Sequence, residues 1–137
     1  MKVVLDASAA VAGVLQHPSG TEVLDLLEKA SLVVAPDLFL AEVTSALWKY
    51  VAAQQLPIDE AISRLEAAGK LVDRYSPVDA LAQEVLREAA VRKHSVYDLF
   101  YAVLARREGA GVVTIDGRLR KLLTTMSVPV YPATEPS

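Results

Sequence analysis

The chain alternates between short apolar segments and longer segments in which apolar residues recur every three or four positions. The short segments are rich in Val and Leu, which is typical of buried β-strands. We predict strands at residues 2–6, 31–36, 70–75, 111–116 and 128–131. We predict helices at residues 7–16, 19–30, 38–55, 58–69, 78–93, 95–108 and 117–123. Strands that alternate with helices indicate an α/β protein, so we expect a three-layer α/β/α sandwich with a small parallel sheet.

Local signals mark several of the predicted helix ends. Ser19 and Glu22 have the spacing of a capping box, and Asp37 is a suitable N-cap for the helix at 38–55. Gly109 is expected to end the helix that begins near Ser95. The last six residues follow a final short strand and are expected to fray.

Length and hydropathy indicate one domain with an exposed apolar surface. A chain of 137 residues suits a single domain spanning 1–137. Hydrophobic residues make up 53% of it, which is high, so we expect a partner to cover part of the surface. We predict that the helices at 38–55 and 58–69 form a groove or dimer surface, with Trp48 and Tyr50 as anchors. Ordinary core packing of these aromatic residues is the alternative.

Composition excludes several kinds of chemistry. The chain contains no cysteine, so it has no disulfide and no thiolate metal site, and its histidines, His17 and His94, form no zinc motif. It opens directly with a strand and has no long apolar run, so we expect a cytoplasmic protein without a membrane segment. The net charge of −3 argues mildly against nucleic-acid binding. That argument weakens if several of the acids surround a metal ion.

Four acidic residues stand at positions that a solvent-facing acid does not usually occupy. Asp6 and Asp116 end predicted strands, and functional sites of parallel sheets form at the carboxyl ends of their strands. Glu42 and Asp98 lie in strongly apolar helices without the cation that usually follows an exposed helix acid by a turn.

Each acid also has a simpler explanation when it is taken alone. Asp6 can cap the following helix, and Asp116 precedes a glycine in a common turn pair. Asp98 completes a capping box with Ser95, and Glu42 can face solvent. A cap can also hold a carboxylate in place for a second task, so these interpretations do not exclude a shared site.

Taken together, the four acids favour a metal site. Carboxylates that gather in one place raise one another's pKa, and a divalent cation removes that penalty. Oxygen ligands without Cys or His indicate Mg²⁺ or Mn²⁺. Ser8 and Thr114 lie two residues from Asp6 and Asp116, and their hydroxyls could support a carboxylate or a metal-bound water. The alternative for both is an ordinary structural role.

Four segments of the chain together resemble the PIN-domain ribonucleases, in particular the VapC-type toxins. In chain order they are "VVLDASA", "AEVTSAL", "SVYDLFYAVLA" and "VVTIDGRL". The resemblance implies a divalent-metal endoribonuclease with a small parallel sheet, frequent dimerisation and inhibition by a cognate antitoxin. The active-site residues that it implies are the acids Asp6, Glu42, Asp98 and Asp116, supported by Ser8 and Thr114.

The resemblance also suggests a mechanism. Asp6, Asp98 and Asp116 would gather Mg²⁺ directly or through water, and Glu42 would orient the attacking water or act as its base. In-line attack on the RNA phosphodiester would leave a 5′-phosphate and a 3′-hydroxyl. Three basic residues follow the last acid and could hold RNA phosphates, the alternative being a solvated helix face. They are Arg118, Arg120 and Lys121.

Three other functions compete with this hypothesis. A binding module with a metal-dependent adhesion site uses D-x-S-x-S, but the third polar position here is Ala10. A phosphoacceptor signalling domain usually has paired acids after its first strand and a lysine at a late strand end, where this chain has only Asp6 and then Asp116. The third is a catalytically silent PIN-like domain that only binds a partner.

Overall fold

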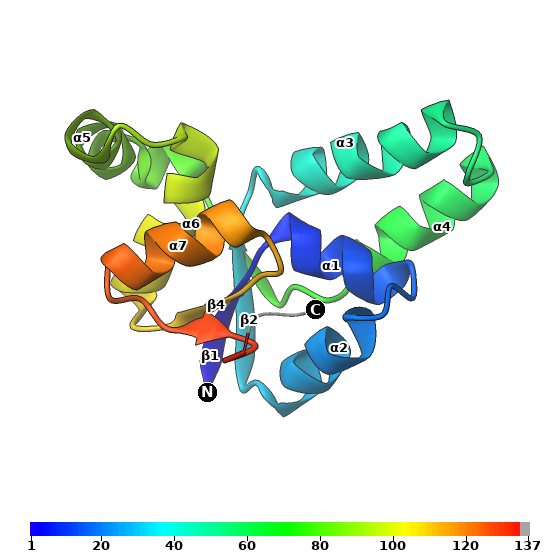
Figure 1. Ribbon diagram of the computed structural model, residues 1–137, viewed down its shortest axis with the longest axis horizontal. Coiled ribbons are helices and arrows are strands. Elements are labelled where there is room, and N and C mark those ends of the chain that lie inside the picture. Colours follow the sequence, from blue (N-terminus) through cyan, green and yellow to red (C-terminus); the bar gives the residue numbers. More distant parts are fainter. Residues whose placement is uncertain (135–137) are drawn as a thin grey trace.

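All strands of the sheet are parallel, so their carboxyl ends lie at the same edge. A computed structural model describes residues 1–134 of the chain, shown in Figure 1. Within this part, the strands pair in the order β3-β2-β1-β4-β5, and every pairing is parallel. The strands are β1 (Lys2–Leu5), β2 (Leu32–Pro36), β3 (Arg74–Ser76), β4 (Gly111–Val113) and β5 (Val130–Tyr131).

Helices connect the strands and cover both faces of the sheet. They are α1 (Ala7–Val14), α2 (Gly20–Lys29), α3 (Phe39–Ala52), α4 (Ile58–Gly69), α5 (Ala82–Arg92), α6 (Val96–Glu108) and α7 (Gly117–Thr125). A short 3₁₀ helix, Val78–Ala80, precedes α5. No helix among residues 1–134 is long and apolar enough to cross a membrane.

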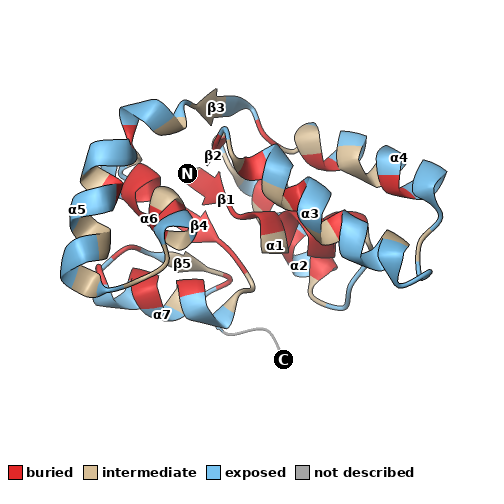
Figure 2. Ribbon diagram, turned by 90° about the horizontal axis from the view of Figure 1, so that it is seen from above, coloured by how far each residue is buried: buried red, intermediate tan, exposed pale blue. Residues whose placement is uncertain are grey.

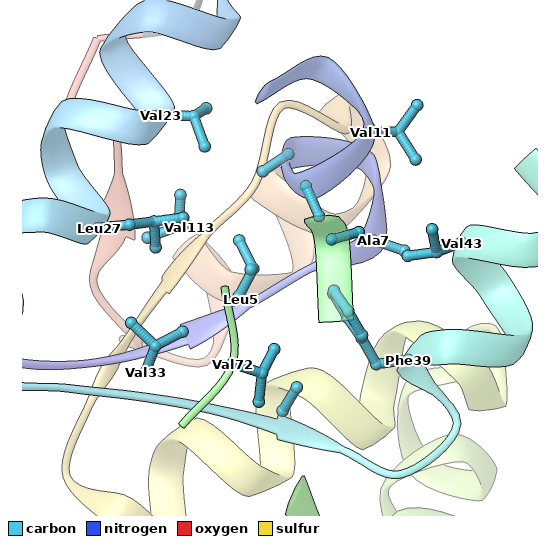
Figure 3. Packing of buried hydrophobic residues seen from close by; sticks show 14 of the residues in the cluster. Leu5, Ala7, Val11, Val23, Leu27, Val33, Phe39, Val43, Val72 and Val113 are labelled. Carbon is cyan, nitrogen blue, oxygen red and sulfur yellow. The ribbon is translucent and has the colours of Figure 1, made fainter. Parts of the chain in front are cut away.

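Alternating strand residues divide the core in two. Val3 and Leu5 of β1 pack against α1, α2, α3 and α4, whereas Val4 between them faces α5, α6 and α7. Figure 2 shows the buried residues concentrated in β1, β2 and β4 and on the inner sides of the helices. Figure 3 shows the first core, where Leu5, Val33 and Val113 of three strands meet helix residues. The predicted three-layer α/β/α sandwich is therefore confirmed.

The topology creates a switch point beside β1. From β1 the chain proceeds to β2 and β3 on one side, whereas β4 and β5 lie on the other side. In open α/β sheets, ligands bind beyond the carboxyl ends of the strands at such a point. The Asp6 N–H donates a hydrogen bond to the Val113 carbonyl at 3.0 Å, so the ends of β1 and β4 are held together here.

Two predicted caps are replaced by other contacts. Ser19 makes no side-chain cap bond, and its N–H instead donates to Nδ1 of His17 at 3.2 Å. The Asp37 carboxylate accepts from the N–H of Val78 at 3.0 Å, so it joins two distant segments instead of capping α3. In the first case a histidine two residues earlier accepts the N–H of the expected capping residue, and in the second a backbone N–H 41 positions away occupies the carboxylate.

Element boundaries also shift where turns compete with regular structure. The predicted strand at 70–75 begins at Arg74, because Lys70 and Leu71 donate back to the end of α4. The predicted helix at 78–93 is divided into the 3₁₀ helix and α5. Gly109 does end α6, with a φ of +62° that favours glycine. Of the tail predicted to fray, residues 135–137 lie outside the described residues.

Candidate active site

Asp6 is the most buried of the four acids, with 7% of its surface exposed. It caps α1 by accepting from the N–H of Ser8 at 3.3 Å. The same oxygen, Oδ2, accepts from the hydroxyl of Ser8 at 2.5 Å and that of Thr114 at 2.7 Å. Burial raises the pKa of Asp6 to about 6; Glu42 and Asp116 add to this, while the two hydroxyl bonds oppose it. The cap and site interpretations of Asp6 are therefore compatible.

The second oxygen of Asp6 is left without a protein donor. All of its hydrogen bonds among residues 1–134 are made by Oδ2. Every fully buried side-chain nitrogen or oxygen in this part of the chain has a partner, so Oδ1 must reach the solvent. Asp6 thus presents one fixed oxygen to the protein and one available oxygen to a ligand.

Asp116 is anchored in the same way at the neighbouring strand end. It caps α7, with Oδ1 accepting from the N–H of Arg118 at 2.9 Å. Its own N–H donates to the Thr114 hydroxyl at 3.0 Å, and that hydroxyl donates to Asp6. Ser8 provides a second link, because its hydroxyl accepts from the N–H of Ile115 at 3.3 Å. The two predicted supporting residues therefore join the β1 and β4 ends.

Glu42 approaches the strand ends from α3 and is held by Tyr101 of α6. The Tyr101 hydroxyl donates to Oε1 of Glu42 at 2.6 Å, and Tyr101 is only 1% exposed. Burial raises the pKa of Glu42, the Tyr101 bond lowers it, and Asp98 and Asp116 raise it further. Oε2 has no hydrogen-bond donor among the described residues. Glu42 therefore does not sit on a freely solvated helix face.

Tyr101 itself was not predicted as a site residue. Its pKa is raised far above the usual range, first by burial and then by Asp6 and Glu42, so it remains a protonated donor. The sequence shows only that Glu42 lacks a nearby cation in its helix and that Tyr101 lies among apolar residues in another helix. Pairing the two requires knowing how α3 and α6 face each other.

Asp98 is the least constrained of the acids. The capping box predicted with Ser95 does not form, because Ser95 makes no side-chain cap bond at the start of α6. The nearest basic group is the ring of His94, whose Nδ1 lies 3.9 Å from Oδ2 of Asp98. Burial raises the pKa of Asp98, as does Asp116, while His94 and Arg118 lower it. Its carboxylate accepts no hydrogen bond from residues 1–134.

The four carboxylates lie near enough to one another for their charges to interact. Asp116 raises the pKa of each of the other three acids, Glu42 also acts on Asp6, and Asp98 on Glu42. Within residues 1–134, however, no three His, Cys, Asp or Glu side chains lie close enough to hold one ion directly. Mg²⁺ keeps several waters and needs only one or two direct carboxylates, so this oxygen-only set fits a hydrated Mg²⁺ or Mn²⁺.

Comparisons with known proteins identify the family of this chain. Residues 3–122 match the PIN domain family. The chain belongs to the PIN domain family. Ribonuclease VapC3 of Pyrobaculum aerophilum is 31% identical over an aligned length of 133 residues, and the match covers 94% of this chain and 100% of that protein. Residues 3–122, which match the family model, include all four acids, Ser8, Thr114 and Tyr101.

Two crystal structures carry the same fold. PAE2754 from Pyrobaculum aerophilum has a TM-score of 0.63 and 26% identity, covering 93% of this chain and 96% of that one. VapBC2 from Rickettsia felis, bound to a promoter DNA fragment, has a TM-score of 0.67 and 19% identity, covering 95% and 97%. The second likeness supports the fold alone.

Membership of the PIN domain family decides between the competing hypotheses. An adhesion-type binding module and a phosphoacceptor signalling domain are different folds, so both are wrong for this chain. The sequence patterns also disfavour them: Ala10 departs from the adhesion motif, and a single acid follows β1 where a phosphoacceptor domain has two. The catalytically silent PIN-like domain remains the alternative to an active nuclease.

The three basic residues after Asp116 have different environments in this PIN domain. Arg118 and Lys121 are exposed, and the charge of Arg118 acts on Asp98. Arg120 donates to the backbone carbonyl of Thr114 at 2.9 Å and to that of Pro132 at 2.6 Å. These bonds favour a structural role for Arg120 over the predicted contact with RNA.

Helices α3 and α4 form the expected apolar groove away from the acids. It encloses about 200 Å³ and is lined by Leu47, Trp48, Ile58 and Ile62, among others. Trp48 is 63% exposed and Ile58 60%, which is high for large apolar side chains. Tyr50 does not line this groove. Two residues along a helix differ by about 200° in direction, so Trp48 and Tyr50 lie on different faces of α3.

Proposed function

We propose that this PIN domain is a metal-dependent endoribonuclease and the toxin of a toxin–antitoxin pair. The observation that carries the proposal is the pattern of anchored carboxylates at the switch point. Asp6, Asp116 and Glu42 each have one oxygen held by the protein and one without a protein donor. A VapC relative that is named a ribonuclease and matches nearly the whole chain supports the same function.

Mg²⁺ or Mn²⁺ would be held by Asp6, Asp98 and Asp116, partly through water. When bound, such an ion lowers the pKa of water and neutralises charge on a phosphoryl group. The tight hydroxyl contacts of Asp6 fix the direction of its free oxygen. Asp98, which accepts no protein hydrogen bond, can adjust to the ligand. This division suits an open site that must accept both an ion and a substrate phosphate.

Glu42 is the proposed general base. Its raised pKa brings it closer to neutrality than a free glutamate, which favours proton acceptance at physiological pH. Tyr101 holds one oxygen and leaves the other to orient a water molecule. That water attacks phosphorus in line and gives its proton to Glu42, while the bond to the 3′-oxygen breaks and the 3′-oxygen takes a proton from solvent. The products are a 5′-phosphate and a 3′-hydroxyl.

RNA phosphates would be held by exposed cations close to the acids. Arg118 and Lys121 are exposed on α7 and follow Asp116 directly in the chain. Their charges would offset the repulsion between RNA and four carboxylates. We therefore keep Arg118 and Lys121 as the proposed phosphate contacts of this helix.

The α3–α4 groove is the surface that we assign to a protein partner, either a second copy of the chain or an antitoxin. Its lining is almost wholly apolar, and Trp48 in its wall is the kind of residue that anchors interfaces. Light scattering of the isolated chain separates the two. A dimer that Trp48→Glu dissociates assigns the groove to a second copy, and a monomer leaves it to the antitoxin.

Cleavage of labelled RNA with defined metal ions tests the proposed activity. The parent protein should cleave single-stranded RNA in Mn²⁺ or Mg²⁺ and stop when EDTA is added. Asp98→Asn should lower the activity, because the amide is a weaker metal ligand than the carboxylate. The Asp98 carboxylate accepts no hydrogen bond from residues 1–134, so the substitution should leave the fold intact. A control variant at an exposed position of α2, Glu28→Gln, should cleave normally. Absence of cleavage by the parent with every metal, or full activity of Asp98→Asn, would favour the catalytically silent domain.

A further inference from the structure

A second groove runs between α1 and α3, and Ser8 of the candidate site is part of its wall. It consists of two adjoining cavities of about 470 and 340 Å³ that share Ser8, Val11 and Tyr50 in their walls. The Ser8 hydroxyl donates to Asp6, so the groove adjoins the candidate active site. The larger cavity extends past Tyr50 to Gln55, beyond the end of α3.

The register of α3 explains how the groove connects with the acids. Glu42, Ala46 and Lys49 are separated by four and three residues, so they lie along one face of the helix. Ala46, Lys49 and Tyr50 line the larger cavity. Eight residues of helix separate Tyr50 from Glu42, a distance of about 12 Å along the axis. A ligand in the groove would therefore extend from the reacting centre along α3.

The walls of this groove contain an aromatic ring, an amine and an amide whose polar atoms are free to bind a ligand. Tyr50 is 38% exposed, and its hydroxyl makes no hydrogen bond within residues 1–134. Lys49 is exposed and has no carboxylate within 4.0 Å in this part of the chain. Gln55 is held next to Tyr50, because its N–H donates to the Tyr50 carbonyl at 2.9 Å, while its side-chain amide remains available.

The second cavity adds a histidine with a defined tautomer. Nδ1 of His17 accepts from the N–H of Ser19, so the neutral ring carries its proton on Nε2. His17 lines the smaller cavity together with Tyr50 and Ser8. It can offer a hydrogen-bond donor to a ligand in this part of the groove.

We propose that the α1–α3 groove binds a nucleotide of the RNA substrate that flanks the scissile phosphate. This inference rests on the proposed nuclease function and extends it to substrate binding. The base would stack on Tyr50, Lys49 would contact a phosphate, and Gln55 would hydrogen-bond to the base edge. Stacking on an aromatic ring and a nearby cation are the usual elements of single-strand recognition.

Charge and polarity distinguish this groove from the one between α3 and α4. An apolar protein segment matches the α3–α4 groove, which is lined almost entirely by aliphatic and aromatic carbon. The α1–α3 groove instead mixes an aromatic ring with an amine and an amide. Its amine also offsets the repulsion that the neighbouring carboxylates exert on a phosphodiester. These features favour a nucleotide as the occupant.

Fluorescence anisotropy of a labelled RNA tests the proposal separately from catalysis. The probe is a 12-nucleotide single-stranded RNA of mixed sequence, and the protein carries Asp98→Asn so that the probe stays intact. Tyr50→Ala should weaken binding about tenfold, and Tyr50→Phe should restore most of it. Lys49→Ala should weaken binding a few-fold and lower the salt dependence by about one counterion. Lys29→Ala, an exposed lysine on α2, is the matched control and should bind as the parent does.

Base preference supplies an independent measurement. The parent should bind homopolymer probes of U, A, C and G with different affinities, and Gln55→Ala should reduce the differences between these affinities. If the parent cleaves and binds RNA but Tyr50→Ala and Lys49→Ala bind as tightly as Lys29→Ala, the groove is not the nucleotide site and only this inference fails. If the parent neither cleaves nor binds any RNA, the proposed function fails and the inference falls with it.

Discussion

The four acids form two pairs that the protein holds in different ways. Asp6 and Asp116 follow strands, cap helices and share the Thr114 hydroxyl, so backbone and side-chain bonds fix both of them. Glu42 and Asp98 come from helices, and the first is held by a single tyrosine while the second accepts no hydrogen bond from the described residues. The strand pair is thus built into the fold, whereas the helix pair is free to respond to a ligand.

The largest effect is expected at Glu42, the proposed base of the helix pair. Glu42→Gln should lower the single-turnover cleavage rate by about 10²–10⁴-fold, since an amide cannot accept the proton of the attacking water. The amide can still accept the Tyr101 bond, so the fold should be unchanged. Cleavage in Mn²⁺ measures the rate, with the exposed Glu28→Gln as the control. A loss below tenfold would mean that Glu42 is not the base.

The strand pair is tested through the pH dependence of stability in EDTA. The folded pKa of Asp6, about 6, lies above its usual 3.8 because of burial. A raised folded pKa contributes stability that is complete below pH 3.8 and is lost as pH rises through 6. The parent should therefore lose about 2–3 kcal/mol of unfolding free energy over this range relative to Asp6→Asn.

At neutral pH, a bound metal ion should offset the stability that the parent loses through the charge on Asp6. Mg²⁺ stabilises the charged carboxylates, so it should raise the melting temperature of the parent at pH 7.5 but not that of Asp6→Asn. Thermal melts with and without Mg²⁺ measure both effects. Equal pH profiles for the two proteins in EDTA would show that Asp6 does not titrate as an isolated buried acid.

Tyr101→Phe examines the single contact that holds Glu42. Because the Tyr101 bond lowers the pKa of Glu42, its removal should move the acidic limb of the rate profile to higher pH and lower kcat about tenfold. The loss of one hydrogen bond should also cost about 1 kcal/mol of stability. Tyr131→Phe is the matched control, since the Tyr131 hydroxyl makes no hydrogen bond within residues 1–134. An unshifted pH profile would limit Tyr101 to a packing role.

The smallest effect is expected at Ser95, the predicted cap that does not form. Ser95→Ala should change the free energy of unfolding by less than about 0.5 kcal/mol, although a working serine cap contributes about 1 kcal/mol. Urea denaturation measures the difference. A larger loss would mean that Ser95 does cap α6 and that the start of this helix, including Asp98, is held more firmly than its hydrogen bonds indicate.

The contrast between the pairs also explains what the sequence could predict. The strand pair follows from local pattern alone, because strand ends and helix starts are visible in a few residues around Asp6 and Asp116. For Glu42 the absence of a nearby cation indicated a special environment, but not its partner. Tyr101 is 59 positions away, and its pairing depends on the rotation of α3 against α6.

Other errors have the same origin. Asp37 is predicted to cap α3 but binds Val78, 41 positions away, because the pairing of β2 with β3 brings the two segments together. Trp48 and Tyr50 were assigned to one surface, although helical geometry places them on different faces. In each case the sequence identified an unusual residue correctly, and the long-range packing that decides its partner could not be obtained from spacing.

The double attachment of Asp6 has a consequence for how this protein can diverge. Any substitution there disturbs the start of α1 and the Thr114 network along with the chemistry, so a loss of catalysis by that route also weakens the scaffold. Glu42 and Asp98 carry no such structural duty. A descendant that kept the fold only to capture a partner would therefore be expected to discard those two acids first.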